Sequence, residues 1–269
     1  MNRDLLLRQF RPTWLGRILE CHEALASTND RARELLDELG PEANGTVVFA
    51  GEQTGGRGRL GRSWQSRRGL GLACSVALWI ERSPGGLPPL QLAGSLAALL
   101  ALRETAGVHG KLKWPNDVLL DGKKVCGVLV ESRFLGEAPA GLVVGIGVNL
   151  LHEVEDFPLE LRTTATSVFL ASRRRVAPDT FAASLLRALG PLVEEGLANP
   201  PSLVAQASPH WIHEMGSPLV LAVGSGSFRG TFAGVAPDGA LLLDVDGQRR
   251  TVHDGEVVRV RPAESGARG

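Results

Sequence analysis

Apolar positions recur along this chain with a helical period in some stretches and as short continuous runs in others. The helical pattern covers four segments, residues 29–39, 88–105, 178–196 and 201–214. Ser27 and Thr28 form an N-cap pair before the first segment, and Gly40-Pro41 ends it. Pro209 interrupts the last segment and predicts a break there. These segments predict helices on several sides of a common core.

The short apolar runs predict strands. They lie at residues 46–50, 72–80, 118–131 and 141–150. The second run is apolar almost throughout, which is typical of a strand buried on both faces of a sheet. The third run is divided by Asp121-Gly122, a dipeptide that favours a tight β-hairpin turn. The main part of the chain is therefore expected to contain both strands and helices.

The pattern changes after Gly216. From residue 218 to 261 the chain carries short β-rich runs, and Gly- and Asp-containing turns separate them every eight or so residues. Such spacing predicts a small barrel or sandwich. About 45 residues form little core, so this module is expected to pack on the larger domain. We expect a main domain at 1–215, a second domain at 216–263 and a frayed tail at 264–269.

Composition narrows the class of protein. Lysine and arginine together equal aspartate and glutamate at 29 each, so the net charge is zero, whereas general nucleic-acid binding shows a positive excess. Cys21, Cys74 and Cys126 form no C-x-x-C pair, so the cysteines indicate neither a zinc site nor disulfides. We find no signal peptide and no run long enough to span a bilayer. These features predict a soluble cytoplasmic protein that does not bind membranes.

The most unusual local feature is a loop in which glycine and arginine alternate, residues 56–62, called the Gly-Arg loop below. Arg57, Arg59 and Arg62 lie in it, and Arg67 and Arg68 follow shortly after. Clustered cations repel one another, and glycine adds backbone freedom, so the loop is expected to be poorly ordered alone. Guanidinium groups pair well with carboxylate and phosphate oxygens. The loop therefore predicts a clamp that an anionic ligand orders.

Other interpretations of this loop stay open at this point. A basic glycine-rich run is often a solvated surface loop, and it also resembles RNA-binding segments. The loop contains G-x-G-x-x-G and nearly contains a P-loop, but both motifs need a helix directly afterwards. The next ten residues carry no helical apolar stripe, so we discount both motifs.

A second cluster of polar residues surrounds the predicted hairpin. Lys113-Trp114-Pro115-Asn116-Asp117 opens it, and Lys124 and Gly127 lie on the returning strand. A carboxamide and a carboxylate beside lysines are typical of a site for Mg²⁺ and phosphate or an acyl phosphate. Gly127, which has no side chain, leaves space for a ligand to approach the strand. Solvated lysines around a buried Trp114 are the ordinary structural alternative.

Together, these motifs resemble those of biotin–protein ligases. The resemblance rests on the Gly-Arg loop through Trp64, Lys113 to Asp117, Lys124 to Glu131, and Gly145-x-Gly147-x-Asn149, in that order. Ser27-Thr28-Asn29 and Gln53 match further positions of the family's pocket. The resemblance covers roughly residues 20–260. Each motif is weak to moderate alone, but their order and spacing together are specific.

The resemblance implies a fold and a reaction. The fold would be of the α+β class, with the mixed sheet and helices of the class II aminoacyl-tRNA synthetase and biotin-ligase type, followed by a small C-terminal SH3-like β-barrel. The reaction would have two steps. Biotin and ATP form biotinyl-5′-AMP and pyrophosphate, and the biotinyl group then passes to a lysine of a biotin carboxyl carrier protein.

The resemblance also implies roles for individual residues. Catalysis would fall to Lys124, Arg59 and Asp117. Biotin would be bound by Ser27, Thr28, Asn29, Gln53, Arg57, Gly58, Arg59, Lys124 and Gly127. The nucleotide would be bound by Arg59, Arg62, Trp64, Asn116, Lys124 and Asn149, and Mg²⁺ would be held by Asn116 and Asp117. Trp114 is expected to be a packing residue.

Partners follow from the same resemblance. The family's usual acceptor is the carrier subunit of acetyl-CoA carboxylase. Some members carry an N-terminal DNA-binding domain, but only about twenty residues precede the matched region, so we expect no DNA binding. The family includes monomers and dimers, so a homodimer stays open. The alternatives are a lipoate–protein ligase of the same fold and a non-catalytic RNA-binding module.

Overall fold

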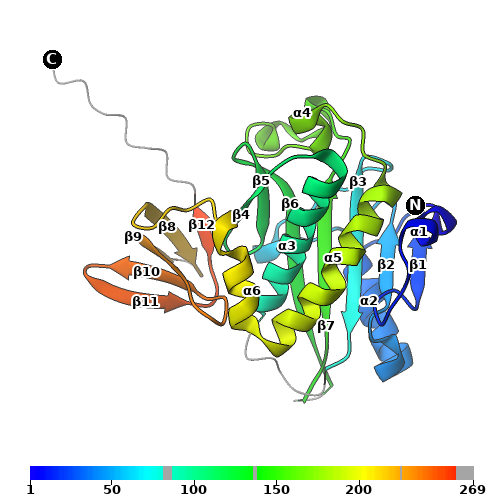
Figure 1. The fold of residues 1–269 in the computed structure, drawn as a ribbon, viewed down its shortest axis with the longest axis horizontal. Helices are drawn as coiled ribbons and strands as arrows, with labels where there is room; N and C mark the ends of the chain where they lie inside the picture. The colour runs from blue at the N-terminus through cyan, green and yellow to red at the C-terminus, as the bar shows by residue number, and fades with distance from the viewer. Residues whose placement is uncertain (81–86, 136–137, 225, 259–269) are drawn as a thin grey trace.

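The larger part of the molecule is a seven-stranded mixed sheet in the computed structural model, which describes residues 1–80, 87–135, 138–224 and 226–258 (Figure 1). The strand order is β1-β2-β3-β7-β6-β5-β4. Only β1 and β2 pair in parallel; the other neighbours are antiparallel. The bounds are Leu19–His22 (β1), Val47–Ala50 (β2), Gly71–Leu78 (β3), Lys111–Lys113 (β4), Asp117–Leu120 (β5), Lys123–Leu135 (β6) and Ala138–Asn149 (β7).

Helices cover the two faces of this sheet unequally. They are α1 (Arg3–Gln9), α2 (Thr28–Leu39), α3 (Pro88–Ala106), α4 (Val168–Ser172), α5 (Pro178–Ala198) and α6 (Pro200–Ala207). In Figure 1, α3 and α5 lie side by side across the front of the sheet. They bury the main core, to which the central strands contribute residues such as Val76, Ile146 and Val128.

The opposite face of the central strands carries small residues. Because side chains alternate along a strand, Ser75 points away from the face that packs on α3. Gly145 and Gly147 occupy positions on the same opposite face, where they leave it without side chains. Helix α2 covers one end of this second face, where Ala32 and Leu36 pack against Val143 in a smaller core. The rest of this face is left for the candidate site described below.

Residues 218–258 form a separate antiparallel sheet with its own core. Its strands are β8 (Pro218–Val223), β9 (Gly226–Val235), β10 (Leu241–Val245), β11 (Gln248–Val252) and β12 (Glu256–Val258), in the order β11-β10-β9-β8-β12. Trp114 of the larger part is buried in this second core, and its Nε1 donates to Gly239 O at 3.0 Å. The small sheet therefore packs against the larger part through Trp114. The burial of Trp114 fits the packing role expected for it.

The architecture confirms the predicted α+β class, and most predicted elements fall where periodicity placed them. Asp121 and Gly122 both have positive φ, at 48° and 72°, as a two-residue hairpin turn of type I′ requires. The predicted helix at 201–214 was too long, because α6 ends at Ala207 and Pro209 lies in a 3-10 turn at Ser208–His210. The predicted tail at 264–269 and residues 259–263 lie outside the described residues.

Two further findings bear on the excluded classes. Within the described ranges, no helix is both long and apolar enough to cross a membrane. The same ranges contain no group of three or more His, Cys, Asp or Glu side chains that could hold a metal ion.

Candidate active site

A cavity of about 690 Å³ lies between the glycine-bearing face of the sheet, the Gly-Arg loop and the second sheet. This volume is typical of small-molecule sites. Every candidate residue from the sequence lines this cavity: Ser27, Thr28, Asn29, Gln53, Arg57, Gly58, Arg59, Arg62, Trp64, Asn116, Asp117, Lys124, Gly127 and Asn149. Residues separated by up to 122 positions thus meet in one place, although their individual roles stay predictions.

One end of the cavity is a buried polar network at the start of α2. Ser27 is the N-cap of α2, and its Oγ accepts from Asp30 N at 3.4 Å. Gln53 Oε1 accepts from both Thr28 N (2.7 Å) and Thr28 Oγ1 (3.0 Å). Ser27, Thr28 and Asn29 are each at most 5 % exposed. Ser27 therefore combines helix capping with its predicted pocket role.

Asn29 is held from two sides within this network. Ser75 Oγ donates to Asn29 Oδ1 at 2.6 Å, and Asn29 Nδ2 donates to Glu131 Oε2 at 2.6 Å. Its amide lies directly on strand β7, since a Cβ added at Gly145 would come within 2.2 Å of Asn29 Oδ1. Only glycine fits at this position. We call these polar groups, Ser27 to Asn29 with Gln53 and Ser75, the head-group network.

Arg57 closes this end of the cavity through ion pairs. Its guanidinium makes two hydrogen bonds of 2.7 Å to Asp30 and contacts Glu131 Oε2 at 3.3 Å. The hydrogen bond from Arg57 holds the pKa of the Asp30 carboxyl below its usual range. The structure thus gives the Arg57 side chain two carboxylate partners within the protein, which the sequence analysis did not anticipate.

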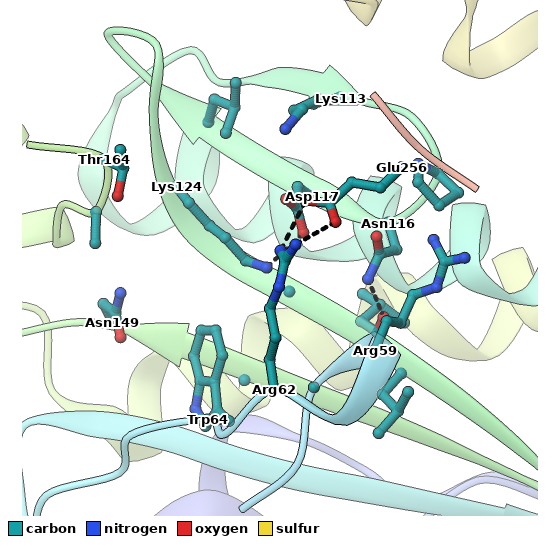
Figure 2. A pocket seen from close by; sticks show the side chains of 18 of the residues that line it. Arg59, Arg62, Trp64, Lys113, Asn116, Asp117, Lys124, Asn149, Thr164 and Glu256 are labelled. Atoms are coloured by element: carbon teal, nitrogen blue, oxygen red, sulfur yellow. Dashed lines mark hydrogen bonds and ion pairs between the residues drawn. The ribbon is translucent and has the colours of Figure 1, made fainter. Parts of the chain in front are cut away.

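The other two loop arginines are paired with the second sheet. Arg59 donates to Gly255 O at 3.1 Å and forms an ion pair with Asp254, and Arg62 makes two hydrogen bonds to the Glu256 carboxylate (Figure 2). Burial raises the pKa of Glu256, but the hydrogen bond and charge of Arg62 outweigh it, so that its pKa is lowered overall. Asp254 and Glu256 together are called the acidic pair below.

The loop itself is folded back on its own backbone. Gly58 N donates to Arg62 O at 2.7 Å, and Trp64 N donates to Gly56 O at 2.8 Å. The element that follows is strand β3 rather than a helix, which agrees with the rejection of the two nucleotide motifs. The expected repulsion among the loop arginines is offset by carboxylates that come from α2, β6 and the second sheet.

Lys124 occupies the middle of the cavity. Its Nζ lies 2.6 Å from Asp117 Oδ1 and 5.7 Å from the centre of the Trp64 ring (Figure 2). A Cβ at Gly127 would lie 3.0 Å from Lys124 Nζ, and a Cβ at Gly147 would lie 2.4 Å from the Trp64 indole. Both glycines therefore make room for these two side chains, whereas the sequence analysis assigned the space at Gly127 to a ligand.

Two amides at the rim of this central region are partly committed to the backbone. Asn116 Nδ2 donates to Val128 O at 2.6 Å, and Asn149 Nδ2 donates to Thr166 O at 3.1 Å. These bonds fix the orientation of each amide, so its Oδ1 is left as the atom available to other partners. Figure 2 shows Asn149 on the Trp64 side of Lys124 and Asn116 on the Arg59 side.

Several residues that line the cavity or bond to its lining had no role predicted from the sequence. Glu256 lies 194 positions from its partner Arg62, so no local pattern could have paired them. His213 also lines the cavity; burial and the nearby Lys113 lower its pKa to about 4, so it is neutral at ordinary pH. Glu131 ends the motif that runs from Lys124 to Glu131, and this position was the only indication in the sequence that it lies near the site. Ser75 sits in an apolar run and offered none.

Comparison with known proteins agrees with this geometry. The model of the family described as "Biotin/lipoate A/B protein ligase family" matches residues 22–149, and that of the "Biotin protein ligase C terminal domain" matches residues 216–260. The biotin--[acetyl-CoA-carboxylase] ligase of Paracoccus denitrificans is 33 % identical over 87 % of this chain and 98 % of its own length. The chain therefore belongs to the biotin protein ligase family.

Further relatives support this assignment. The biotin--[acetyl-CoA-carboxylase] ligase of Mycobacterium tuberculosis is 31 % identical, over 89 % of both chains. The bifunctional ligase/repressor BirA of Bacillus subtilis is 29 % identical over 90 % of this chain and 74 % of its own length. A solved structure of the biotin protein ligase from Aquifex aeolicus in complex with biotin and ATP superimposes with a TM-score of 0.76 and 28 % identity, over 90 % of this chain and 98 % of that one.

Proposed function

We propose that this chain is an ATP-dependent biotin–protein ligase whose acceptor is a lysine of a biotin carboxyl carrier protein of acetyl-CoA carboxylase. The observation that carries this proposal is the meeting of the head-group network, Lys124 and the loop arginines in one cavity. A neutral polar pocket at one end and a cationic region at the other suit a ligand with a polar ring and a carboxylate that must meet a triphosphate.

In the first step, a carboxylate oxygen of biotin attacks the α-phosphorus of ATP. The bond from that phosphorus to the bridging oxygen breaks, and pyrophosphate leaves with the bonding electrons. Both reactants are anions, so fixed cations must offset their repulsion. Lys124 lies at the centre of the cavity with Arg59 and Arg62 on one side, and these three side chains would supply that charge.

The paired state of the arginines bears on how ATP enters. Because Asp254 and Glu256 occupy Arg59 and Arg62, phosphate oxygens would have to take the place of these carboxylates. Phosphate offers more acceptor oxygens and more charge than a carboxylate, so the exchange is favourable when ATP is bound. The acidic pair thus holds the loop in place before the nucleotide arrives.

Mg²⁺ is the metal that this chemistry requires, and two side chains fit it. Asp117 offers a carboxylate, and Asn116 offers its Oδ1 because its Nδ2 is committed to Val128 O. A site with few protein oxygens suits Mg²⁺, which takes most of its remaining ligands from phosphates and water. When bound, the ion would neutralise phosphate charge.

In the second step, the amine of the acceptor lysine attacks the acyl carbon, and AMP leaves as that carbon–oxygen bond breaks. The acyl adenylate hydrolyses readily, so the site must exclude water until the acceptor arrives. The Gly-Arg loop lies at the cavity and is tied to both α2 and the second sheet, which places it well for this task.

Biotin-dependent exchange of labelled pyrophosphate into ATP tests the first step directly. We expect exchange with biotin and none with lipoate; exchange with lipoate alone would favour the alternative ligase. Mass spectrometry of a purified carrier fragment tests the second step, and one biotinyl addition per fragment is expected. No exchange with biotin under any Mg²⁺ concentration would contradict the proposal.

The RNA-binding alternative fits the structure less well. Its basis was a free basic loop, but Arg57, Arg59 and Arg62 are each paired with a carboxylate. The chain as a whole has no net charge, so it offers an RNA backbone no general electrostatic attraction.

A further inference from the structure

Glu131 lies at the junction between the head-group network and the Gly-Arg loop. It is on strand β6, and its carboxylate accepts from Asn29 Nδ2 at 2.6 Å. The same carboxylate lies 3.4 Å from Arg33 and 3.3 Å from Arg57. Only 25 % of its side chain is exposed. It is therefore an enclosed acceptor with three donors from two separate elements.

The chemistry of these partners decides which of them orients Asn29. An asparagine amide can turn by half a rotation, which exchanges its donor and acceptor sides. The Ser75 hydroxyl can donate or accept and so tolerates either orientation. An ionised carboxylate only accepts, and the reversed amide would place Oδ1 against the Glu131 oxygens. Glu131, and not Ser75, therefore fixes which way the amide faces.

We propose that Glu131 is a positioning residue for biotin: it holds the Asn29 amide with its acceptor side toward Ser75 and its donor side toward β6. This inference rests on the proposed function. The ureido ring of biotin carries both N–H donors and a carbonyl acceptor. A pocket that binds it therefore needs donors and acceptors whose positions are fixed, including those of the Asn29 amide. Glu131 does this without contacting the ring, and it ties the same amide to Arg57 of the loop.

Calorimetric titration of biotin without ATP tests the proposal, with pyrophosphate exchange at saturating biotin as the second readout. Glu131→Ala should raise the biotin Kd roughly tenfold, as expected for a lost hydrogen bond to a charged group. Glu131→Gln keeps the length but offers both a donor and an acceptor, so it can bond to Asn29 without fixing which way the amide faces. Its biotin Kd should therefore fall between the wild-type and Glu131→Ala values. The KM for ATP and kcat should change by less than about twofold in both variants, because Lys124, Arg59 and Arg62 are untouched.

Glu34→Ala is the matched control. This glutamate lies on α2, is 60 % exposed and pairs with Arg31 at 3.2 Å, away from the cavity. It should leave the biotin Kd unchanged. A Glu131→Ala protein with wild-type biotin affinity, a Glu131→Gln protein as weak as Glu131→Ala, or a parallel loss in the ATP parameters would each overturn the proposal.

A swapped pair covers the case in which Glu131→Ala does not fold. Asn29→Asp places two carboxylates against each other, and adding Glu131→Gln restores one donor and one acceptor between them. The double variant should bind biotin more tightly than Asn29→Asp alone, and equal or weaker binding would contradict the orienting role. Failure of the wild-type protein to bind biotin would instead count against the proposed function.

Discussion

The two ends of the cavity prepare for their ligands in different ways. At the head-group network, buried polar groups are satisfied by short hydrogen bonds, and Asn29 is held by Ser75 on one side and by the Glu131 carboxylate on the other. At the opposite end, Arg59 and Arg62 are neutralised by carboxylates from a different sheet. The polar groups at one end are thus held by hydrogen bonds to one another and to Glu131. The arginines at the other end are held in ion pairs whose carboxylates a phosphate could replace.

This difference matches the chemistry of the proposed substrates. A neutral ring gains little from long-range attraction, so its recognition depends on groups already in position, which lowers the entropy lost on binding. A triphosphate is attracted strongly, and unpaired arginines awaiting it would repel one another and leave the loop unstable. The acidic pair removes that repulsion at the cost of competing with the nucleotide.

The largest effect is expected from Lys124→Ala. This change removes the cation at the point where the two ends meet and leaves the biotin carboxylate and the α-phosphate uncompensated. Biotin-dependent pyrophosphate exchange should fall by about 100-fold or more. Lys111→Ala, on an exposed residue of β4, is the control. Near-normal exchange in Lys124→Ala would remove Lys124 from the catalytic role.

Two glycine-to-alanine substitutions on strand β7 should affect the two ends of the cavity separately. Gly145→Ala forces a Cβ against Asn29 and should weaken biotin binding roughly tenfold or more, because small displacements of positioning groups are costly. Gly147→Ala instead displaces the Trp64 indole and should mainly raise the KM for ATP. Titration calorimetry with biotin and exchange kinetics with ATP measure the two effects.

Gly190→Ala on α5 is the control for this pair, since its added Cβ meets Leu15 at an ordinary 3.7 Å. If Gly145→Ala and Gly147→Ala lowered biotin and ATP binding in the same proportion, the cavity would not have two separable ends.

A smaller effect should appear in the pH dependence of stability. His213 has a pKa of about 4 in the folded protein because of its burial, against 6.5 when exposed. The unfolded chain therefore binds more protons below pH 6.5, and the free energy of unfolding should fall as pH decreases from about 6.5 to 4. His213→Gln should flatten the fall in Tm over this window by a few degrees.

His109→Gln, at an exposed position, should leave the pH profile of Tm as it is in the wild type. Identical profiles for His213→Gln and the wild-type protein would mean that burial in the cavity wall does not hold the imidazole neutral.

The sequence predicted the elements and the lining of the cavity better than the contacts inside it. Periodicity located the long helices and central strands, and the spacing of the motifs predicted residues that the fold brings together. The short strands β1 and β4 were missed because three or four residues carry too little pattern. The prediction of the family and fold rested on the order of the motifs rather than on any single motif, and the relatives confirm it.

Contacts between distant segments could not be predicted in this way. The loop was expected to be unstable because only its own charges were counted, whereas its partners Asp30, Glu131, Asp254 and Glu256 come from elsewhere in the chain. Gly127 was assigned to ligand approach, but its space holds Lys124. Such pairings depend on tertiary packing, which local patterns do not record.

We infer that the acidic pair competes with ATP for the loop arginines, whereas the head-group network is in place before biotin binds. The direct test is the KM for ATP and the biotin Kd in a variant that combines Asp254→Asn and Glu256→Gln, with Asp244→Asn, in an exposed ion pair with Arg249, as control. We predict a KM for ATP several-fold lower and an unchanged biotin Kd, because amides compete less strongly for guanidinium. An unchanged or higher KM for ATP would mean that the acidic pair does not compete with the nucleotide.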